Sequence, residues 1–331
     1  MRAPWFIAYR EWFNCVLLLT SLLIAPSVPA RAASPSPKEL LDSGNVDRVV
    51  LLLSEQIRRS PDNSEAHNLL CRAYFMAEEW DRGIAECERA VALAPQNSNY
   101  YLWLGRTYGE KADRSSFMSA AGLAKKARVA FERAVELDPK NVGARVDLGE
   151  FCAEAPGIVG GGKDKARQQA DALMSLNPAM GHWVLARIAE KEKDPALAER
   201  EYRAEIEASH SGVRGWLDLA NFFKYAHRYP EMEQALTTME SSHVDRPESI
   251  MHGGSLLLRA QYNYPLGIRL LRRYLSDGPV EDGPAFRAHN YLGELLEKQG
   301  DPRAAAEEFR AALALFHDYQ RARENLKRLE H

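Results

Sequence analysis

Residues 157–164, Gly-Ile-Val-Gly-Gly-Gly-Lys-Asp, contain the residue types of a phosphate-binding loop. Glycines let backbone N–H groups surround a phosphate, and Lys163 follows the last glycine, where a lysine can reach the phosphate oxygens. The next residue is Asp164, whereas such loops carry a serine or threonine that holds magnesium. The segment also lies between two expected helices and does not follow a strand. We therefore interpret it as an insertion in a turn, where glycines supply positive φ and Asp164 lies near the next helix start; nucleotide binding is the alternative.

Catalytic and metal-binding patterns are absent from the rest of the sequence. The nine histidines are scattered, without the His-x-x-x-His or His-Glu-x-x-His spacing of a metal site, and there is no Gly-x-Ser-x-Gly motif. Adjacent acids such as Glu307 and Glu308 lie on an expected helix, on a face that we expect to be solvated. The sequence therefore predicts no enzyme activity, no cofactor and no metal.

The composition is that of an ordinary globular protein. The chain has 331 residues, of which 46% are hydrophobic and 27% charged, and its formal net charge is −3. Because there is no basic excess, the composition does not indicate nucleic-acid binding.

The elements that must position any site are helices that recur at near-constant spacing. The pattern is clearest at Tyr101–Pro139. Small residues, Gly105 and Ala127, allow two antiparallel helices to approach, and large residues fill the space between them. Proline disfavours helical geometry in the preceding residue, so Asp138-Pro139 ends the second helix. The large residues of this segment are Tyr101, Leu104, Tyr108 and Phe131.

This pattern resembles the tetratricopeptide repeat, a helix-turn-helix unit of 34 residues. One unit cannot bury its own apolar face, so neighbouring units must stack. The resemblance implies an all-α, right-handed superhelical solenoid whose concave face binds peptides or protein segments, and it implies no reaction. The solenoid is expected over 39–331, with units near 39–63, 64–97, 98–141, 142–178, 179–212, 213–246, 248–281 and 286–319, and a C-terminal capping helix at 320–331.

Two cysteines, Cys71 and Cys87, lie on facing helices of one unit, in slots for small residues. They could form a disulfide outside the cytoplasm. We favour two reduced core cysteines, since the slots are about one helical turn out of register, near the limit of disulfide reach. Cys152 is expected to be a plain core residue.

The first helix of each unit is expected to line the concave groove. Arg72, Arg106 and Arg187 occupy the same slot of three units, with Glu150 in that slot of the unit between them. Arginine pairs bidentately with carboxylates, so this face could bind an acidic or carboxylate-ended peptide segment. Alternatively, the arginines are solvated or pair with nearby acids such as Glu65 and Glu110. The predicted groove residues are Asn68, Arg72, Phe75, Trp103, Arg106, Trp183, Arg187, Asn221 and Lys224.

The first 32 residues differ from the rest. Arg2 and Arg10 precede a short apolar run, and Ala30-Arg31-Ala32 follows it, which is the pattern of a secretory signal peptide. We expect cleavage after Ala32 and a linker at 33–38, which places the mature protein in the periplasm or outside the cell. An uncleaved N-terminal membrane anchor is the alternative.

Together, these patterns predict an exported, non-enzymatic scaffold of the bacterial type, which binds a protein or peptide in its groove. The alternative is a structural or assembly component of a cell-envelope complex. No membrane span is expected after signal cleavage.

Overall fold

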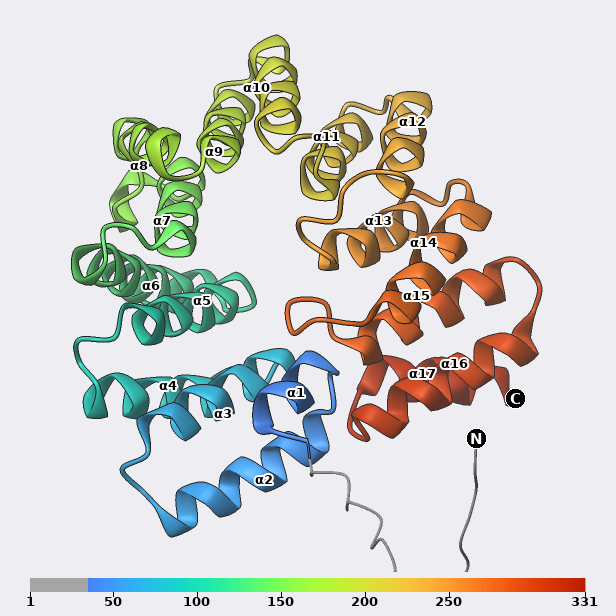
Figure 1. The fold of residues 1–331 in the computed structure, drawn as a ribbon, viewed down its shortest axis with the longest axis horizontal. Coiled ribbons are helices and arrows are strands. Elements are labelled where there is room, and N and C mark those ends of the chain that lie inside the picture. Colours follow the sequence, from blue (N-terminus) through green and yellow to red (C-terminus); the bar gives the residue numbers. More distant parts are fainter. Residues whose placement is uncertain (1–34, 331) are drawn as a thin grey trace, which may run out of the picture. The chain divides into compact units, whose positions relative to one another are not determined.

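The computed structural model describes residues 35–330, so the predicted signal peptide lies outside the described residues. Within 35–330 the chain consists of α-helices and one 3-10 helix, with no strand (Figure 1), and the predicted all-helical fold is confirmed. The elements are α1 (Pro37–Asp42), α2 (Val46–Arg59), α3 (Ser64–Met76), α4 (Trp80–Leu93), α5 (Ser98–Asp113), α6 (Phe117–Leu137), α7 (Val142–Glu154), η1 (Gly157–Val159), α8 (Lys163–Leu176), α9 (Pro178–Lys191), α10 (Pro195–Ala208), α11 (Val213–Tyr225), α12 (Tyr229–Glu240), α13 (Glu248–Ala260), α14 (Tyr264–Asp277), α15 (Ala285–Lys298), α16 (Pro302–Leu315) and α17 (Gln320–Leu329).

Successive helices pack as antiparallel pairs, and each pair packs on the next. Figure 1 shows that α5, α7, α9 and α11 face the inside of the curved stack, whereas their partners α6, α8, α10 and α12 lie outside. Residues on the first helix of each pair are therefore the ones that can meet in a shared groove.

Asparagine side chains begin several of these helices. Asn63, Asn141 and Asn177 are N-cap residues whose side chains accept backbone N–H groups of the first turn of α3, α7 and α9. Such caps satisfy donors that have no partner inside the helix. Helix α6 ends at Leu137, directly before Asp138-Pro139, as the proline rule predicts.

Gly105 in α5 allows the close packing of helices that the sequence predicts. A Cβ atom at this position would lie 2.5 Å from ring atoms of Phe131 in α6, which is too close for any side chain. The aromatic ring therefore packs directly on the backbone of the facing helix, and Ala127 beside it is fully buried.

A histidine–glutamate pair joins the two helices of three units, always with the glutamate 19 positions after the histidine. The nitrogen–oxygen distances are 2.5 Å for His67–Glu86, 2.9 Å for His182–Glu201 and 2.6 Å for His289–Glu308. Three of the histidines that look scattered along the sequence are thus one repeated structural contact.

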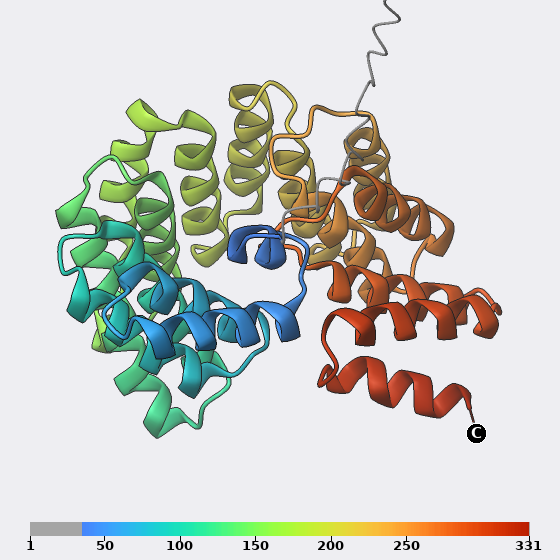
Figure 2. The same cartoon turned by 60° about the horizontal axis from the view of Figure 1, so that its bottom comes forward.

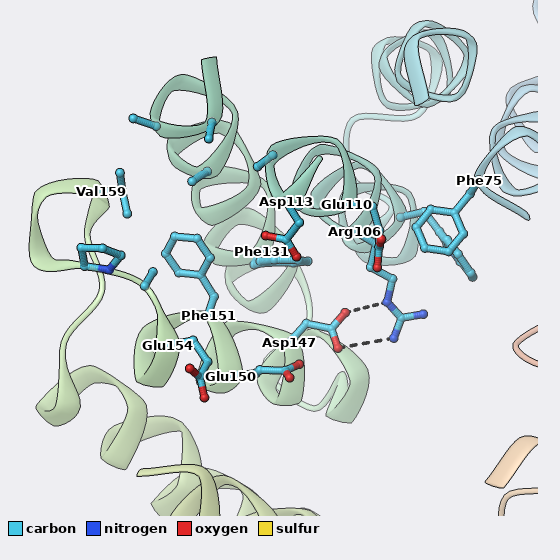
Figure 3. A pocket seen from close by; sticks show the side chains of 18 of the residues that line it. Phe75, Arg106, Glu110, Asp113, Phe131, Asp147, Glu150, Phe151, Glu154 and Val159 are labelled. Atoms are coloured by element: carbon cyan, nitrogen blue, oxygen red, sulfur yellow. Dashed lines mark hydrogen bonds and ion pairs between the residues drawn. The ribbon is translucent and has the colours of Figure 1, made fainter. Parts of the chain in front are cut away.

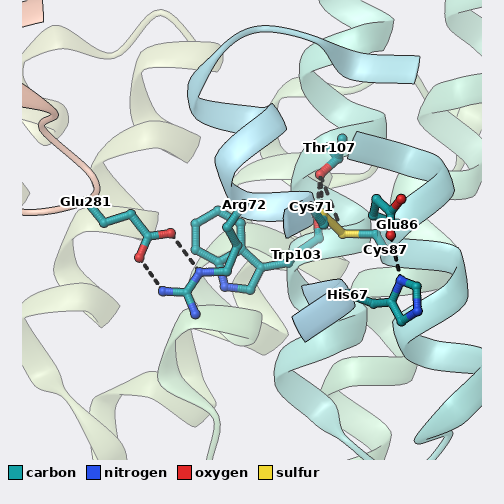
Figure 4. The surroundings of a disulfide bond; sticks show 8 residues. All are labelled: His67, Cys71, Arg72, Glu86, Cys87, Trp103, Thr107 and Glu281. Carbon is teal, nitrogen blue, oxygen red and sulfur yellow. Dashed lines mark hydrogen bonds and ion pairs between the residues drawn. A yellow bond between two sulfur atoms is a disulfide. The ribbon is translucent and has the colours of Figure 1, made fainter. Parts of the chain in front are cut away.

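Cys71 in α3 and Cys87 in α4 form a disulfide bond (Figure 4). Our interpretation that these cysteines are reduced is therefore wrong. Their Cα atoms are 5.2 Å apart, well within disulfide reach, so the predicted offset of one helical turn does not exist. Cys152 is a free, buried cysteine, as expected.

The two ends of the described chain share one hydrophobic core. Residues of α1–α3, including Leu41 and Leu53, cluster with Phe286, Phe316 and Ala322 from the C-terminal helices. The ring of Phe286 lies 5.4 Å from that of Phe316, between ring centroids. The first and last units therefore bury apolar surface against each other, in addition to the packing of each on its own neighbours.

We call the contact between α1–α3 and the segment from residue 281 to α17 the closure. Polar contacts accompany it. The His317 backbone N–H donates to Asp47 at 2.8 Å, and Arg287 donates to the Met76 carbonyl at 3.0 Å. Figures 1 and 2 show the blue N-terminal helices beside the orange and red C-terminal ones. Helix α17 packs on α15 and α16 as a capping helix would, but the end that it caps also contacts the start of the solenoid.

Candidate functional site

The predicted groove arginines lie on the first helices, and each is ion-paired within the chain. Arg72 in α3 donates from Nε to Glu281 at 2.7 Å (Figure 4). Arg106 in α5 donates to Asp147 in α7 at 2.6 Å. Their acid partners come from other units or from a distant loop, so these pairs also tie neighbouring elements together.

Arg187 in α9 is also ion-paired within the chain. It donates to Glu154 at the end of α7 at 2.8 Å and also pairs with Glu190. The alternative that the arginines pair with acids of the chain is therefore what the structure contains, although the acids are not the expected Glu65. An incoming carboxylate would have to displace these partners.

Trp103 in α5 brings two of the arginines together. The guanidinium carbons of Arg72 and Arg106 each lie 4.9 Å from the centre of its ring, a cation–π geometry. Phe75 from α3 packs edge-on against the same ring, with 5.4 Å between ring centroids. Three first-helix residues predicted for the groove thus form one cluster around Trp103.

The remaining predicted residues are less accessible or lie elsewhere. Asn68 is buried, and its amide nitrogen has no hydrogen-bond partner within residues 35–330. Asn221 donates to the Leu217 carbonyl of its own helix at 3.1 Å, and Lys224 lies over the ring of Tyr225. Neither Asn221 nor Lys224 lines the two cavities described below. A ligand-binding role for any of the nine residues stays a prediction.

The first cavity, which we call the α5–α7 cavity, has a volume of about 720 Å³ and lies between α5, α6, α7 and the loop around η1 (Figure 3). Phe75, Trp103, Phe131 and Phe151 are its aromatic lining residues. Alanines of α6 and Val159 complete the apolar wall. This volume falls in the range of ligand pockets, and aromatic walls with a few polar groups are typical of them.

Acidic side chains surround this apolar interior. Figure 3 shows Glu110 and Asp113 of α5 on one side and Asp147 and Glu150 of α7 on the other. Burial is the main cause that raises the pKa of Glu150, to about 7, and the nearby Asp147 adds to it. Burial also raises the pKa of Glu110. The six acids that line the cavity are Glu110, Asp113, Asp147, Glu150, Glu154 and Asp282.

None of these six acids is among the predicted groove residues, although the spacing of most of them carries a signal. Asp147, Glu150 and Glu154 are spaced by three and four residues, which places them on one face of α7. Glu110 and Asp113 share a face of α5 in the same way. Only the distant Asp282 has no local signal.

The glycine-rich loop forms one wall of this cavity. It follows helix α7 and leads into α8 at Lys163, so it lacks the strand that precedes a phosphate-binding loop. Gly160 and Gly162 have φ of +100° and +155°, which confirms the interpretation as a turn insertion. Lys163 pairs with Glu192. The loop therefore shapes a cavity and leaves its lysine in an exposed ion pair.

The second cavity, of about 830 Å³, is lined by α7, by α9, by the loop before α11 and by the loop between α12 and α13. Arg106, Trp183 and Arg214 line it, together with Asp245 and Asp282. Its charges are mixed, in contrast to the acidic α5–α7 cavity. Trp183, a predicted groove residue, lies beneath Arg214, whose guanidinium carbon is 5.0 Å from the centre of the ring.

A buried charge cluster supports this part of the groove. Arg214 lies 3.3 Å from Asp218 and 3.8 Å from the fully buried Glu205. Burial, with Asp218 as the next cause, raises the pKa of Glu205 well above its usual value. Asp218 is the nearer counter-charge of Arg214, whose guanidinium lies over the ring of Trp183.

Within residues 35–330, no group of three or more His, Cys, Asp or Glu side chains is arranged to hold a metal ion. No helix there combines the length and apolar character that crossing a membrane requires.

Comparisons with known proteins give one family. Tetratricopeptide repeat profiles match residues 40–106 and 254–319. Among solved structures, yeast Tom70 is similar over 86% of this chain and 58% of its own, with 14% identity and a TM-score of 0.55. This chain thus spans less than two thirds of Tom70.

A tetratricopeptide repeat protein from Parabacteroides merdae is similar over 89% of this chain and 96% of its own, with 13% identity and a TM-score of 0.45. No match was found among curated proteins. At these identities the likeness to solved structures concerns the fold alone.

Proposed function

This chain belongs to the tetratricopeptide repeat family, and we propose that it is a non-enzymatic scaffold that binds a segment of a partner protein in its groove. Such repeats are generally scaffolds for protein interaction. The observation that carries the proposal is the pair of cavities along the first helices, with Trp103 and Trp183 among their walls. Buried aromatic residues beside charged groups are the usual anchors of a protein interface.

We also propose that the protein acts outside the cytoplasm, in the periplasm or beyond. The signal-peptide pattern of the first 32 residues supports this location. The disulfide between Cys71 and Cys87 supports it as well, because disulfides persist in oxidising compartments. Amino-terminal sequencing of protein from the envelope tests it: a start near Ala33 is expected, and a retained Met1 would point to the anchored form.

The groove arginines lead to a more specific form of this proposal, in which the bound segment is acidic or ends in a carboxylate. A carboxylate would reach Arg72 by taking the place of Glu281, and Arg106 by taking the place of Asp147. Such an exchange leaves the displaced acid without its partner, so it disfavours weakly bound acidic segments. Neutralising Glu281 should therefore strengthen binding of any acidic segment that uses Arg72.

A photo-crosslinking experiment tests groove binding without assuming a charge for the partner. A photoreactive phenylalanine replaces Gly109 or His210, which line the two cavities, in the full chain produced in its native cells. The matched control positions are Gly122 and Arg133, on α6, neither of which lines either cavity. We expect one partner to be crosslinked from the cavity positions only. Crosslinks to that partner from Gly122 and Arg133 alone would overturn groove binding.

A further inference from the structure

Two departures from the 34-residue repeat meet at the α5–α7 cavity. The unit at 98–141 is longer than its neighbours, and Ala120, Ala121 and Ala124, near the start of its 21-residue second helix α6, line the cavity. The loop inserted after α7 lines it too, through Pro156, Ile158 and Val159. Stacking of helix pairs alone needs neither insertion. Two insertions that enclose one cavity indicate a feature specific to this chain.

The charge of this cavity is strongly unbalanced. Six carboxylates line it, and Arg106 is its one basic lining residue. Arg106 is already paired with Asp147, and Arg187, outside the lining, pairs with Glu154. Within residues 35–330, no basic nitrogen lies within 4.0 Å of the carboxylates of Asp113, Glu150 or Asp282. Glu150 is half-buried, whereas Asp113 and Asp282 are exposed, and Figure 3 shows Glu150 between Asp147 and Glu154.

We propose that the α5–α7 cavity binds a lysine or arginine side chain that is carried, with apolar neighbours, on an extended segment of the partner protein. This proposal rests on the proposed groove-binding function and names the chemistry of the bound segment. The apolar stem of a long basic side chain can lie against Phe131 and Phe151 while its charge reaches the acidic rim. Neighbouring apolar side chains can pack on Phe75 and on the exposed Ile158, which is 82% accessible.

Charge complementarity decides between this occupant and an acidic one. An acidic segment would bring further negative charge beside the exposed Asp113 and the half-buried Glu150, and like charges brought together disfavour binding. A basic group would instead supply the missing partner of these carboxylates. It would also leave the pairs Arg72–Glu281 and Arg106–Asp147 intact, so no existing ion pair need break.

The test uses the full chain and short acetylated, amidated peptides in which leucine and phenylalanine flank a central lysine, arginine, norleucine or glutamate. Calorimetric titration measures their affinities. We expect the lysine and arginine peptides to bind about tenfold tighter than the norleucine peptide, and the glutamate peptide to bind weakest. The double variant Asp113→Asn/Glu150→Gln should remove this preference. The control variant Asp171→Asn/Glu207→Gln neutralises exposed acids of second helices and should keep it.

A second pair of variants tests the cavity itself. A Cβ atom at Gly109 or at Gly122 would have nothing within 4 Å, so both positions accept a leucine without a clash. Gly109→Leu projects into the cavity and should weaken the lysine peptide about tenfold or more, whereas Gly122→Leu should not change its affinity. Circular dichroism checks that every variant stays helical.

Three results would overturn the proposal: equal affinity for the lysine and norleucine peptides, tightest binding of the glutamate peptide, or no binding of any basic peptide below about 1 mM, the weak end of measurable affinity. These results differ from failure of the proposed function. Crosslinking of a partner from Gly109 and His210 together with no preference for basic peptides would keep the groove and reject the basic segment. Crosslinking from Gly122 and Arg133 alone would reject both.

Discussion

Arg72 and Glu281 form an ion pair although they are 209 positions apart in the sequence, with 2.7 Å between Arg72 Nε and Glu281 Oε1. Arg72 belongs to the third helix, and Glu281 lies in the loop before α15. Both side chains are largely buried, being 18% and 9% exposed. In an open solenoid each unit contacts only its neighbours. This pair therefore ties together two regions that an open stack would leave independent, and it occupies a groove arginine with an acid of the same chain.

The first prediction is that this ion pair contributes measurably to the stability of the fold. A double-mutant cycle with Arg72→Ala and Glu281→Ala should give a coupling of about 1–2 kcal/mol, because partly buried, bidentate pairs are stronger than exposed ones. Urea unfolding measures the free energies of the four proteins.

The control cycle uses Arg58 and Glu55, a pair within α2 whose side chains are 72% and 38% exposed. An exposed pair three residues apart should couple by less than about 0.5 kcal/mol. If both cycles gave the same small value, the Arg72–Glu281 contact would not hold the two ends of the solenoid together.

The second prediction concerns the disulfide between Cys71 and Cys87, whose partners are 16 residues apart. Reduction should lower the free energy of unfolding by about 3 kcal/mol, the value expected for a loop of this length. Urea unfolding with and without reductant measures the difference. The double variant Cys71→Ala/Cys87→Ala is the control and should not respond to reductant.

A thiol titration in denaturant checks the same bond directly. A chain that begins at Ala33 contains Cys71, Cys87 and Cys152. One reactive thiol before reduction, from Cys152, and three afterwards are expected. Three thiols in protein freshly recovered from the envelope would mean that the disulfide does not form there.

The third prediction follows from Glu150, whose pKa is raised to about 7, first by burial and next by Asp147. Between the unfolded pKa of about 4.5 and 7, the folded state binds more protons than the unfolded one, so this group makes stability fall as pH rises through that window. Glu150→Gln should therefore match the wild type at pH 4 and exceed its stability by roughly 2 kcal/mol at pH 8. The other charged groups near Glu150 are Arg106, Glu110, Asp113, Glu154, Arg187, Arg214 and Asp282.

Urea unfolding of both proteins across this pH range provides the measurement. Asp171→Asn, which neutralises an exposed acid of α8, should leave the pH profile unchanged. A variant and wild type that differed equally at pH 4 and pH 8 would show that Glu150 does not titrate in this window.

The sequence predicted the features that depend on local spacing. Gly105 and Phe131 fall at matching positions of two helices, so their contact follows from the repeat pattern. The same pattern placed Arg72 and Arg106 correctly on first helices. It could not give their partners, because Glu281 comes from a loop whose position depends on the summed rotation of all the units between them. A small error in each unit would move that loop far from Arg72.

The site was harder to predict for a second reason. The α5–α7 cavity is lined by residues that interrupt the repeat, including Ala120 and Val159. A prediction from the repeat pattern uses the residues that recur in every unit, so it says nothing about these residues. The prediction of reduced cysteines was wrong because it assumed a helix register that placed Cys71 and Cys87 one turn apart. In the structure the Cα atoms of these two cysteines are 5.2 Å apart. The deviations from the pattern here carry the information about function.

The fourth prediction concerns the loop that forms the wall of this cavity. A Cβ atom at Gly161 would lie 1.8 Å from the Ala155 carbonyl oxygen, so any side chain there forces the loop to move. At Gly157, four residues earlier in the same loop, a Cβ atom would have nothing within 4 Å. Gly161→Ala should therefore lower the free energy of unfolding by about 2 kcal/mol, whereas Gly157→Ala should change it by less than about 0.5 kcal/mol.

Hydrogen exchange locates the damage from Gly161→Ala. The Gly162 N–H donates to the Cys152 carbonyl at 2.8 Å, and Val159 is buried against the cavity wall, so amides of 155–162 should lose protection first. Amides of α13 and α14, which do not contact this loop, should keep their protection. Equal effects of the two alanine substitutions would mean that the loop adapts freely, and then the wall of the α5–α7 cavity would not be a fixed surface for a ligand.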